Sequence, residues 1–95
     1  MSTSTKLSII IVNYNVCDLL RTCLAQIVRE ADQKYTTEVW VVDNNSSDNS
    51  TNMIRSEFPS VKLIANKKNV GYAKANNIAI KKAKGEYVLL LNPDT

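Results

Sequence analysis

The stretch Leu7-Ser8-Ile9-Ile10-Ile11-Val12 decides the fold class of this chain. It is short, nearly continuous in apolar residues and rich in β-branched side chains. Such a run is typical of a strand that is buried on both faces, as in a parallel sheet. Asn13-Tyr14-Asn15 interrupts it, and Asp18 then fits the N-cap of a helix that reaches about Arg29. Helical spacing predicts an inner face made of Leu19, Leu20, Cys23, Leu24, Ile27 and Val28.

Strands and helices alternate along the rest of the chain. Further strands are predicted at 38–42, 61–65 and 86–91, and the alternating polarity of the strand at 61–65 favours a place nearer an edge. A short helix is predicted to end near Phe58, before Pro59, and a longer helix spans about 71–84, with Gly85 as its C-terminal stop. The order βαβαβαβ favours an α/β fold with an open parallel sheet and helices on both faces.

Composition excludes several classes of protein. The 95 residues are 44% hydrophobic and 22% charged, which indicates one small globular domain or a piece of a larger one. Histidine is absent, and the two glycines, Gly71 and Gly85, are too far apart for a Rossmann fingerprint or a P-loop. Cys17 and Cys23 lack metal-binding spacing, which favours reduced thiols in a cytosolic protein. Residues 1–6 are polar and are expected to form a flexible leader rather than a secretory signal.

Polar residues follow every predicted strand. Because the carboxyl ends of parallel strands share one edge of a sheet, these residues are expected to meet there. If the fourth strand lies beside the first, the ligand position falls between Asn13-Tyr14 and Asp94, with Asp43 next to it. The residues at the strand ends are Asn13-Tyr14-Asn15, Asp43-Asn44-Asn45, Asn66 and Asn92-Pro93-Asp94.

Amides, one aromatic ring and two carboxylates suit a nucleotide. Amides and a carboxylate can hydrogen-bond a base and a ribose, and Tyr14 can pack on the base. A carboxylate approaches a diphosphate through a divalent cation, and Mg²⁺ and Mn²⁺ prefer oxygen ligands, so Asp94 is well placed to hold one. The alternative is that these residues only form turns and caps, which asparagine also favours.

Four stretches in order carry a family resemblance: IIIVNYN (9–15), VVDNNSSDNS (41–50), NVGYAKANNIAI (69–80) and GEYVLLLNPDT (85–95). The chain resembles the N-terminal half of a family 2 glycosyltransferase with a GT-A fold, and within that family the rhamnosyltransferase-like branch. The resemblance implies that the chain binds a nucleotide-diphosphate sugar, linked to UDP or dTDP, together with Mg²⁺ or Mn²⁺.

The resemblance also implies residue roles. Asp43 corresponds to the carboxylate that recognises the pyrimidine base, and Asp94 to the metal- and diphosphate-binding member of the DxD-type motif. The full set of implied nucleotide-binding residues is Asn13, Tyr14, Asn15, Asp43, Asn45, Asp48, Gly71, Asn77, Asn92 and Asp94.

Three positions depart from the commoner family pattern. Asn76 stands in place of an arginine, and Lys74 or Lys68 could supply the missing cation. Asn92 replaces the first aspartate of DxD, and Ala79 replaces a glycine.

Family members are considerably longer than this chain. We therefore expect residues 7–95 to be the nucleotide-sugar-binding part of a truncated enzyme, with the general base downstream of Thr95. Glu57 and Glu86 are expected to be solvated surface residues. The full-length enzyme is expected to transfer the sugar to an acceptor hydroxyl with inversion, whereas this chain alone is not expected to transfer sugar.

Partners follow from the same resemblance. A sugar or lipid-linked acceptor in polysaccharide assembly is implied, with a cytoplasmic location, including the inner face of the membrane as a peripheral protein. The net charge of +3 and the dispersed lysines argue against a nucleic-acid partner. An exposed edge on the last strand predicts self-association.

Two other functions are alternatives to the transferase. A non-catalytic nucleotide-binding module fits the short chain and the missing base. A receiver-like or flavodoxin-like domain is disfavoured, because a receiver has an acidic pair after its first strand, where this chain has Asn13 and Asn15.

Overall fold

The computed structural model describes residues 5–31 and 36–93. The elements are β1 (Leu7–Asn13), α1 (Cys17–Ala31), β2 (Thr37–Asp43), α2 (Ser50–Glu57), β3 (Lys62–Ala65), α3 (Tyr72–Lys82) and β4 (Tyr87–Leu91). The predicted order of alternating strands and helices is confirmed, with boundaries that shift by one or two residues.

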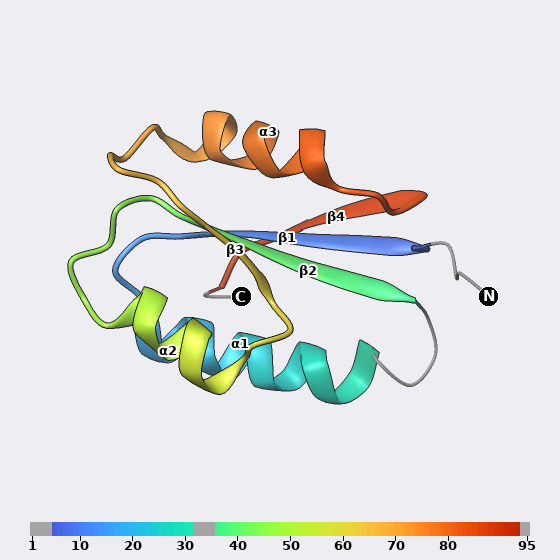
Figure 1. Ribbon diagram of the computed structural model, residues 1–95, viewed down its shortest axis with the longest axis horizontal. Coiled ribbons are helices and arrows are strands. Elements are labelled where there is room, and N and C mark those ends of the chain that lie inside the picture. The colour runs from blue at the N-terminus through green and yellow to red at the C-terminus, as the bar shows by residue number, and fades with distance from the viewer. Residues whose placement is uncertain (1–4, 32–35, 94–95) are drawn as a thin grey trace.

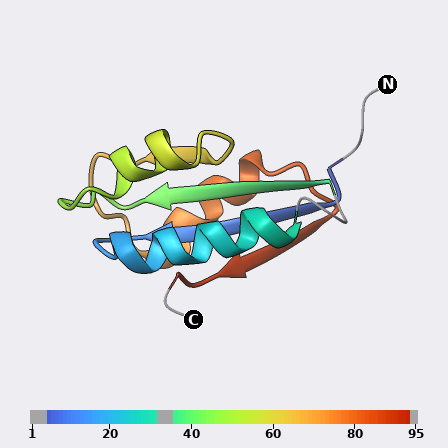
Figure 2. The ribbon, with the colours of Figure 1, turned by 90° about the horizontal axis from the view of Figure 1, so that it is seen from below.

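The four strands form one parallel sheet in the order β3-β2-β1-β4. β3 is therefore an edge strand, as its alternating polarity predicted. β2 and then β3 are added on one side of β1, whereas β4 returns to the other side of β1, where Leu7 pairs with Tyr87. This is the topological switch point at which ligands bind in open α/β sheets. All four strands end at the same edge, on the left of Figure 2.

Helices cover both faces of the sheet, as predicted (Figure 1). α1 and α2 pack on the face that carries Ile9, Ile11 and Val41, and α3 packs on the face that carries Ile10 and Val42. Successive strand residues point to opposite faces, so the continuous apolar run of β1 supplies both cores. Fully burying one such side chain contributes roughly 1.5–3 kcal/mol, which is why β1 and β2 hold the fold together.

Helix α1 corrects two expectations. Asp18 is not the N-cap, because α1 already begins at Cys17, and the Asp18 carboxylate accepts a hydrogen bond from Arg21 in the next turn. Leu19 was expected to face inward but is 48% exposed. Leu20 and Leu24 occupy the buried centre of the helix face. Leu19 lies to one side of that centre.

Gly85 has a different role from the predicted one. α3 ends at Lys82, with Ala83 as its C-cap in an extended conformation, so Gly85 does not terminate the helix. A Cβ atom on Gly85 would lie 2.6 Å from the backbone nitrogen of Ser8 and 2.8 Å from the carbonyl carbon of Leu7. Glycine is therefore required by the close approach of this segment to β1.

A buried carboxylate ties the amino ends of the strands together. Glu38 accepts hydrogen bonds from the Ser8 hydroxyl at 2.6 Å, the Lys84 backbone N–H at 2.6 Å and the Lys62 ammonium at 3.0 Å. Burial alone raises the pKa of Glu38, but these donors outweigh it and lower the pKa to about 2. Glu38 could not be singled out from the sequence, because a lone acidic residue at a strand start gives no pattern.

Some expectations fall partly or wholly outside the described residues. Residues 1–4 of the expected leader and Asp94 lie outside them, whereas Thr5 and Lys6 accept backbone hydrogen bonds from Glu86 and Tyr87. Both cysteines are free thiols. Within residues 5–31 and 36–93, the helices are too short or too polar to cross a bilayer.

Candidate functional site

The site is centred on a pair of side chains at the ends of β1 and β2. Asn13 and Asp43 are register partners, and the Asn13 side-chain amide donates to Asp43 Oδ1 at 2.9 Å. Ser46 adds its hydroxyl to Oδ1 at 2.6 Å and its backbone N–H to Oδ2 at 2.8 Å. The Asp43 carboxylate is buried and fixed in orientation, and its Oδ2 retains capacity to accept one more hydrogen bond.

Two buried amide oxygens have no donor within the described part of the chain. They are Oδ1 of Asn13, beside Asp43, and Oδ1 of Asn76, on the inner face of α3. A buried polar atom without a partner costs about 1–3 kcal/mol, so such atoms point to water or a ligand that satisfies them. The unpartnered Oδ1 of Asn13 lies at the predicted site.

Asn15 locks the loop after β1 to the loop after β2. Its backbone has a φ of +54°, a conformation that asparagine tolerates better than most residues. Its side-chain oxygen accepts from the backbone N–H of Ser47 at 2.7 Å and of Asp48 at 3.2 Å, and its own N–H donates to the Ser46 hydroxyl at 2.9 Å. Asn15 thereby holds the loop after β1 against the loop after β2 with its polar atoms.

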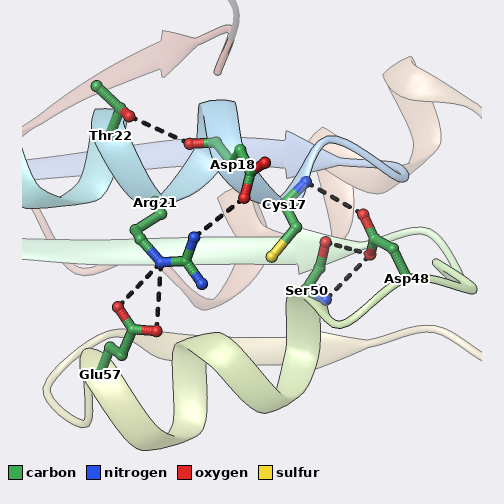
Figure 3. Close-up of polar contacts among 7 residues, drawn as sticks. All are labelled: Cys17, Asp18, Arg21, Thr22, Asp48, Ser50 and Glu57. Atoms are coloured by element: carbon green, nitrogen blue, oxygen red, sulfur yellow. Dashed lines mark hydrogen bonds and ion pairs between the residues drawn. The ribbon is translucent and has the colours of Figure 1, made fainter.

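Asp48 joins the starts of two helices (Figure 3). Its Oδ1 accepts from the backbone N–H of Ser50 at 3.0 Å and from the Ser50 hydroxyl, at the start of α2. Its Oδ2 accepts from the backbone N–H of Cys17 at 3.1 Å, at the start of α1. Partial burial raises the pKa of Asp48, but the donors from Ser50 and Cys17 outweigh it, and the net pKa lies below its ordinary value.

Asn44 fastens the loop between β3 and α3 to the same edge. Its side-chain oxygen accepts from Asn66 Nδ2 at 3.0 Å and from the backbone N–H of Val70 at 3.4 Å, and its Nδ2 donates to the Gly71 carbonyl at 3.3 Å. Gly71 has a φ of +87°, which only glycine adopts readily, and α3 starts directly after it. Three loops are therefore connected by side-chain hydrogen bonds.

The predicted site residues differ in where the structure places them. The structure brings Asn13, Asp43, Asn15 and Asp48 together through the hydrogen bonds above. Tyr14 and Asn45 lie in the same loops with exposed side chains, and Asn92 is exposed just after β4. Asn77 lies on the exposed side of α3, whereas its neighbour Asn76 is buried. Asp94 lies outside the described residues.

Sequence reasoning missed Ser46 and gave Asn44 no role. Both belong to the same turn, and the spacing of Asp43 and Ser46, three residues apart, is typical of a carboxylate that caps a turn with the N–H and hydroxyl of a later residue. Ser46 could therefore have been predicted from that spacing. The role of Asn44 depends on a loop 22–27 residues away, and no local pattern indicates it.

The described residues do not by themselves complete a metal site. Within them, no three histidine, cysteine, aspartate or glutamate residues cluster in a way that could hold an ion. The carboxylates of Asp43 and Asp48 are engaged by protein donors. A cation at this edge would therefore depend on the residue predicted to hold it, Asp94, together with oxygen atoms from its ligand.

Glu57 and Glu86 are surface residues, as predicted. Glu57 pairs with Arg21 and Glu86 with Lys6, each at 3.0 Å, and both glutamates are exposed. The hydrogen bond and charge of Glu57 raise the pKa of the Arg21 guanidinium. Exposed pairs of this kind contribute about 0–1 kcal/mol, and neither lies at the carboxyl edge of the sheet.

Comparison with known sequences identifies relatives. The profile of the family described as Glycosyl transferase family 2 matches residues 8–95. The poly(ribitol-phosphate) beta-glucosyltransferase of Bacillus spizizenii is 38% identical over 94% of the chain, and the glycosyltransferase YibD of Escherichia coli, itself uncharacterized, is 33% identical over 99%. The chain spans only 15% and 27% of the lengths of these two relatives.

Solved structures share the fold. The mannosyltransferase PcManGT from Pyrobaculum calidifontis, in complex with GDP-Man and Mn²⁺, has a TM-score of 0.81 and 28% identity over 98% of this chain and 28% of its own. Residues 1–349 of TarS from S. aureus, in complex with UDP, have a TM-score of 0.83 and 29% identity over 94% of this chain and 27% of that one. TarS has also been solved with UDP-GlcNAc, with a TM-score of 0.77.

Proposed function

Because the chain belongs to glycosyl transferase family 2, we propose that it forms the donor-binding part of an enzyme that transfers a sugar from a nucleotide diphosphate to an acceptor hydroxyl. The observation that carries the proposal is the fixed arrangement of Asn13, Asp43 and Ser46 at the ends of β1 and β2, beside the switch point between β1 and β4. Ligands of open α/β sheets bind at this position.

The nucleotide is proposed to bind across the three connected loops. The free accepting capacity of Asp43 Oδ2 suits an N–H donor of a base, and the unpartnered Asn13 Oδ1 suits a second donor. Tyr14, 51% exposed in the first loop, offers a ring against which the base can stack. Asn15 and Asp48 would act behind this surface, because their side-chain oxygens are already bonded to backbone N–H groups.

The diphosphate and its cation belong to the same proposal. Mg²⁺ or Mn²⁺ is the expected ion and Asp94 the expected ligand, with support from the Mn²⁺ that accompanies GDP-Man in PcManGT. Such an ion stabilises negative charge on a leaving diphosphate. UDP in the TarS structures supports a uridine donor, while dTDP stays an alternative.

The finer properties of the whole enzyme also stay proposals. They are inversion at the transferred sugar, membership of the rhamnosyltransferase-like branch, a sugar or lipid-linked acceptor in polysaccharide assembly, and a cytoplasmic location, including the inner face of the membrane. The poly(ribitol-phosphate) in the name of the Bacillus relative supports a polymeric acceptor. The catalytic base is expected outside residues 1–95, because the described glutamates Glu57 and Glu86 lie in surface ion pairs.

The test is a nucleotide titration of the purified chain followed by NMR. UDP, dTDP and GDP are compared, each with and without Mg²⁺. We expect shifts in the amides of Tyr14, Asp43 and Ser46 with UDP and Mg²⁺. Tyr14→Ala should weaken binding by about tenfold, because base–aromatic stacking is worth roughly 1–3 kcal/mol. Tyr87→Ala is the matched control, since Tyr87 is also exposed but lies at the opposite edge.

The possible outcomes bear on different parts of the proposal. Nucleotide binding without hydrolysis or transfer of a nucleotide sugar agrees with both a donor-binding part and a non-catalytic nucleotide-binding module. Transfer by the 95-residue chain alone would contradict our expectation that the base lies elsewhere. Absence of any shift with all three nucleotides, in a folded chain, would contradict the proposed site.

A further inference from the structure

The positive charge of this chain is unevenly distributed along the sequence. Residues 58–85 hold seven lysines and no acidic residue, so this segment carries a charge of +7. The chain as a whole carries +3, so the remaining residues together carry −4. The segment includes β3, the loop before α3, all of α3 and the turn into β4. The excess of positive charge therefore belongs to one continuous part of the chain.

Folding gathers most of this charge in one layer of the molecule. α3 covers one face of the sheet and α1 and α2 cover the other, above and below the sheet in Figure 1. Six exposed lysines lie on or beside α3 and form what we call the lysine surface: Lys67, Lys68, Lys74, Lys81, Lys82 and Lys84. On the opposite face, α1 and α2 hold equal numbers of acidic and basic side chains, so their charges balance. The described part of the molecule therefore has one strongly positive face.

The ammonium groups of the lysine surface are not neutralised by nearby carboxylates. Within residues 5–31 and 36–93, the lysines that form ion pairs are Lys6, with Glu86, and Lys62, with Glu38, and neither belongs to the lysine surface. Like charges that gather without acidic partners repel one another and destabilise the folded chain. Six such lysines on one face are therefore better explained by an anionic partner than by a contribution to stability.

Apolar side chains accompany these lysines on α3. Tyr72 and Ile80 are 54% and 39% exposed. A hollow of about 560 Å³ on the surface of the helix is lined by Lys74, Asn77, Ile78, Lys81 and Lys82. A helix that combines clustered lysines with exposed apolar groups is typical of an anionic lipid surface as partner. The ammonium groups reach the phosphates, while the lysine stems and apolar side chains contact the acyl boundary.

We propose that the lysine surface binds an anionic phospholipid bilayer, with α3 lying along it. Its lysines are spread over a loop, a helix and a turn, which fits a plane of headgroups better than a single anionic polymer. The inference rests on the proposed function, because the loop 66–71 holds Lys67 and Lys68 and is also bonded to Asn44 at the carboxyl edge. Contact with the bilayer would hold the donor site beside the surface that presents a lipid-linked acceptor.

The test is binding of the chain to lipid vesicles, measured by co-sedimentation. We expect binding to vesicles of phosphatidylcholine mixed with phosphatidylglycerol and no binding to vesicles of phosphatidylcholine alone. Raising the salt from about 0.1 M to about 1 M should release the chain, because the Debye length falls from about 10 Å to about 3 Å. The double variant Lys81→Gln/Lys82→Gln should bind roughly 25-fold more weakly, because each lysine near an anionic surface strengthens binding about fivefold.

The double variant Arg29→Gln/Arg55→Gln is the matched control. These arginines lie in the last turns of α1 and α2, as the two lysines lie in the last turn of α3, so both variants lose two helix-terminal cations and have the same net charge. The arginine variant should bind the anionic vesicles as the natural chain does. Equal weakening in both variants would overturn the assignment to the lysine surface.

Two further results would overturn the membrane proposal. One is a natural chain that does not bind the anionic vesicles, and the other is such a chain that instead binds soluble inorganic polyphosphate through the same two lysines. A UDP titration separates either result from a failure of the proposed function. The lysine variant should keep the shifts at Tyr14, Asp43 and Ser46, and vesicle binding by a natural chain without those shifts would contradict the donor site alone.

Discussion

Asn15 combines two properties in one side chain, a tolerated positive φ and an acceptor for two backbone N–H groups. Substitutions can separate them. Asn15→Ala should lower the free energy of unfolding by about 1–3 kcal/mol, because it loses both hydrogen bonds and adds strain. Asn15→Gly keeps the backbone conformation but not the acceptor, and should fall between alanine and the natural residue.

Asn15→Asp is the conservative control, since it keeps an oxygen at the same place and tolerates the same φ. Urea unfolding of the three variants, with NMR of the Ser47 and Asp48 amides, would check the order. If the glycine variant were as stable as the natural chain, the acceptor would have no importance and backbone strain alone would explain the residue.

Glu38 predicts a dependence of stability on pH. Its pKa is about 2 in the folded chain against 4.5 as an ordinary glutamate. The folded state therefore favours the ionised form, so the stabilisation is complete above about pH 5 and is lost as the pH falls from about 5 toward 2. The pKa difference corresponds to up to about 3 kcal/mol.

Glu38→Gln isolates this contribution. At pH 7 the variant should be less stable than the natural chain in urea, because glutamine cannot pair with Lys62 or accept as strongly from Ser8 and Lys84. The difference should shrink as the pH is lowered to 3. A difference that is constant between pH 7 and pH 3 would show that ionisation of Glu38 is not its source.

At the scale of elements, Asp48 connects the starts of α1 and α2. Asp48→Asn keeps one acceptor oxygen and should cost about 1 kcal/mol, whereas Asp48→Ala loses the bonds to both Cys17 and Ser50 and should cost about 2 kcal/mol. Amide exchange in the first turn of each helix would show which one loosens. If Asp48→Ala left the amide exchange in the first turn of α1 or of α2 unchanged, the shared cap would be contradicted.

The helices also mark where sequence reasoning succeeds and where it stops. The apolar spacing of α1 predicted Leu20 and Leu24 correctly, because their burial depends on the helical repeat alone. Leu19 failed because helical spacing alone does not show how far the buried face extends around the helix. Asp18 failed as a cap because the capping carboxylate, Asp48, comes from a loop 31 residues away. Contacts between distant segments leave no local pattern.

At the scale of the whole molecule, the parallel order and the shared edge could be predicted from four apolar runs. The neighbourhood of Asn13 and Asp43 followed from that order, since both end adjacent strands. The division of roles among the predicted residues did not follow. Only the hydrogen bonds distinguish Asp43, which retains accepting capacity, from Asn15 and Asp48, whose oxygens are bonded to the backbone.

Side-chain hydrogen bonds of Asn15, Asp48 and Asn44 already connect the three loops before any small molecule arrives. Binding of a nucleotide at that edge would then cost little entropy for ordering the loops and would need no slow rearrangement. Diffusion and the orientation of the two molecules when they meet would therefore set the association rate. Weak nucleotides should accordingly exchange rapidly, giving resonances that move continuously during a titration instead of splitting into two sets.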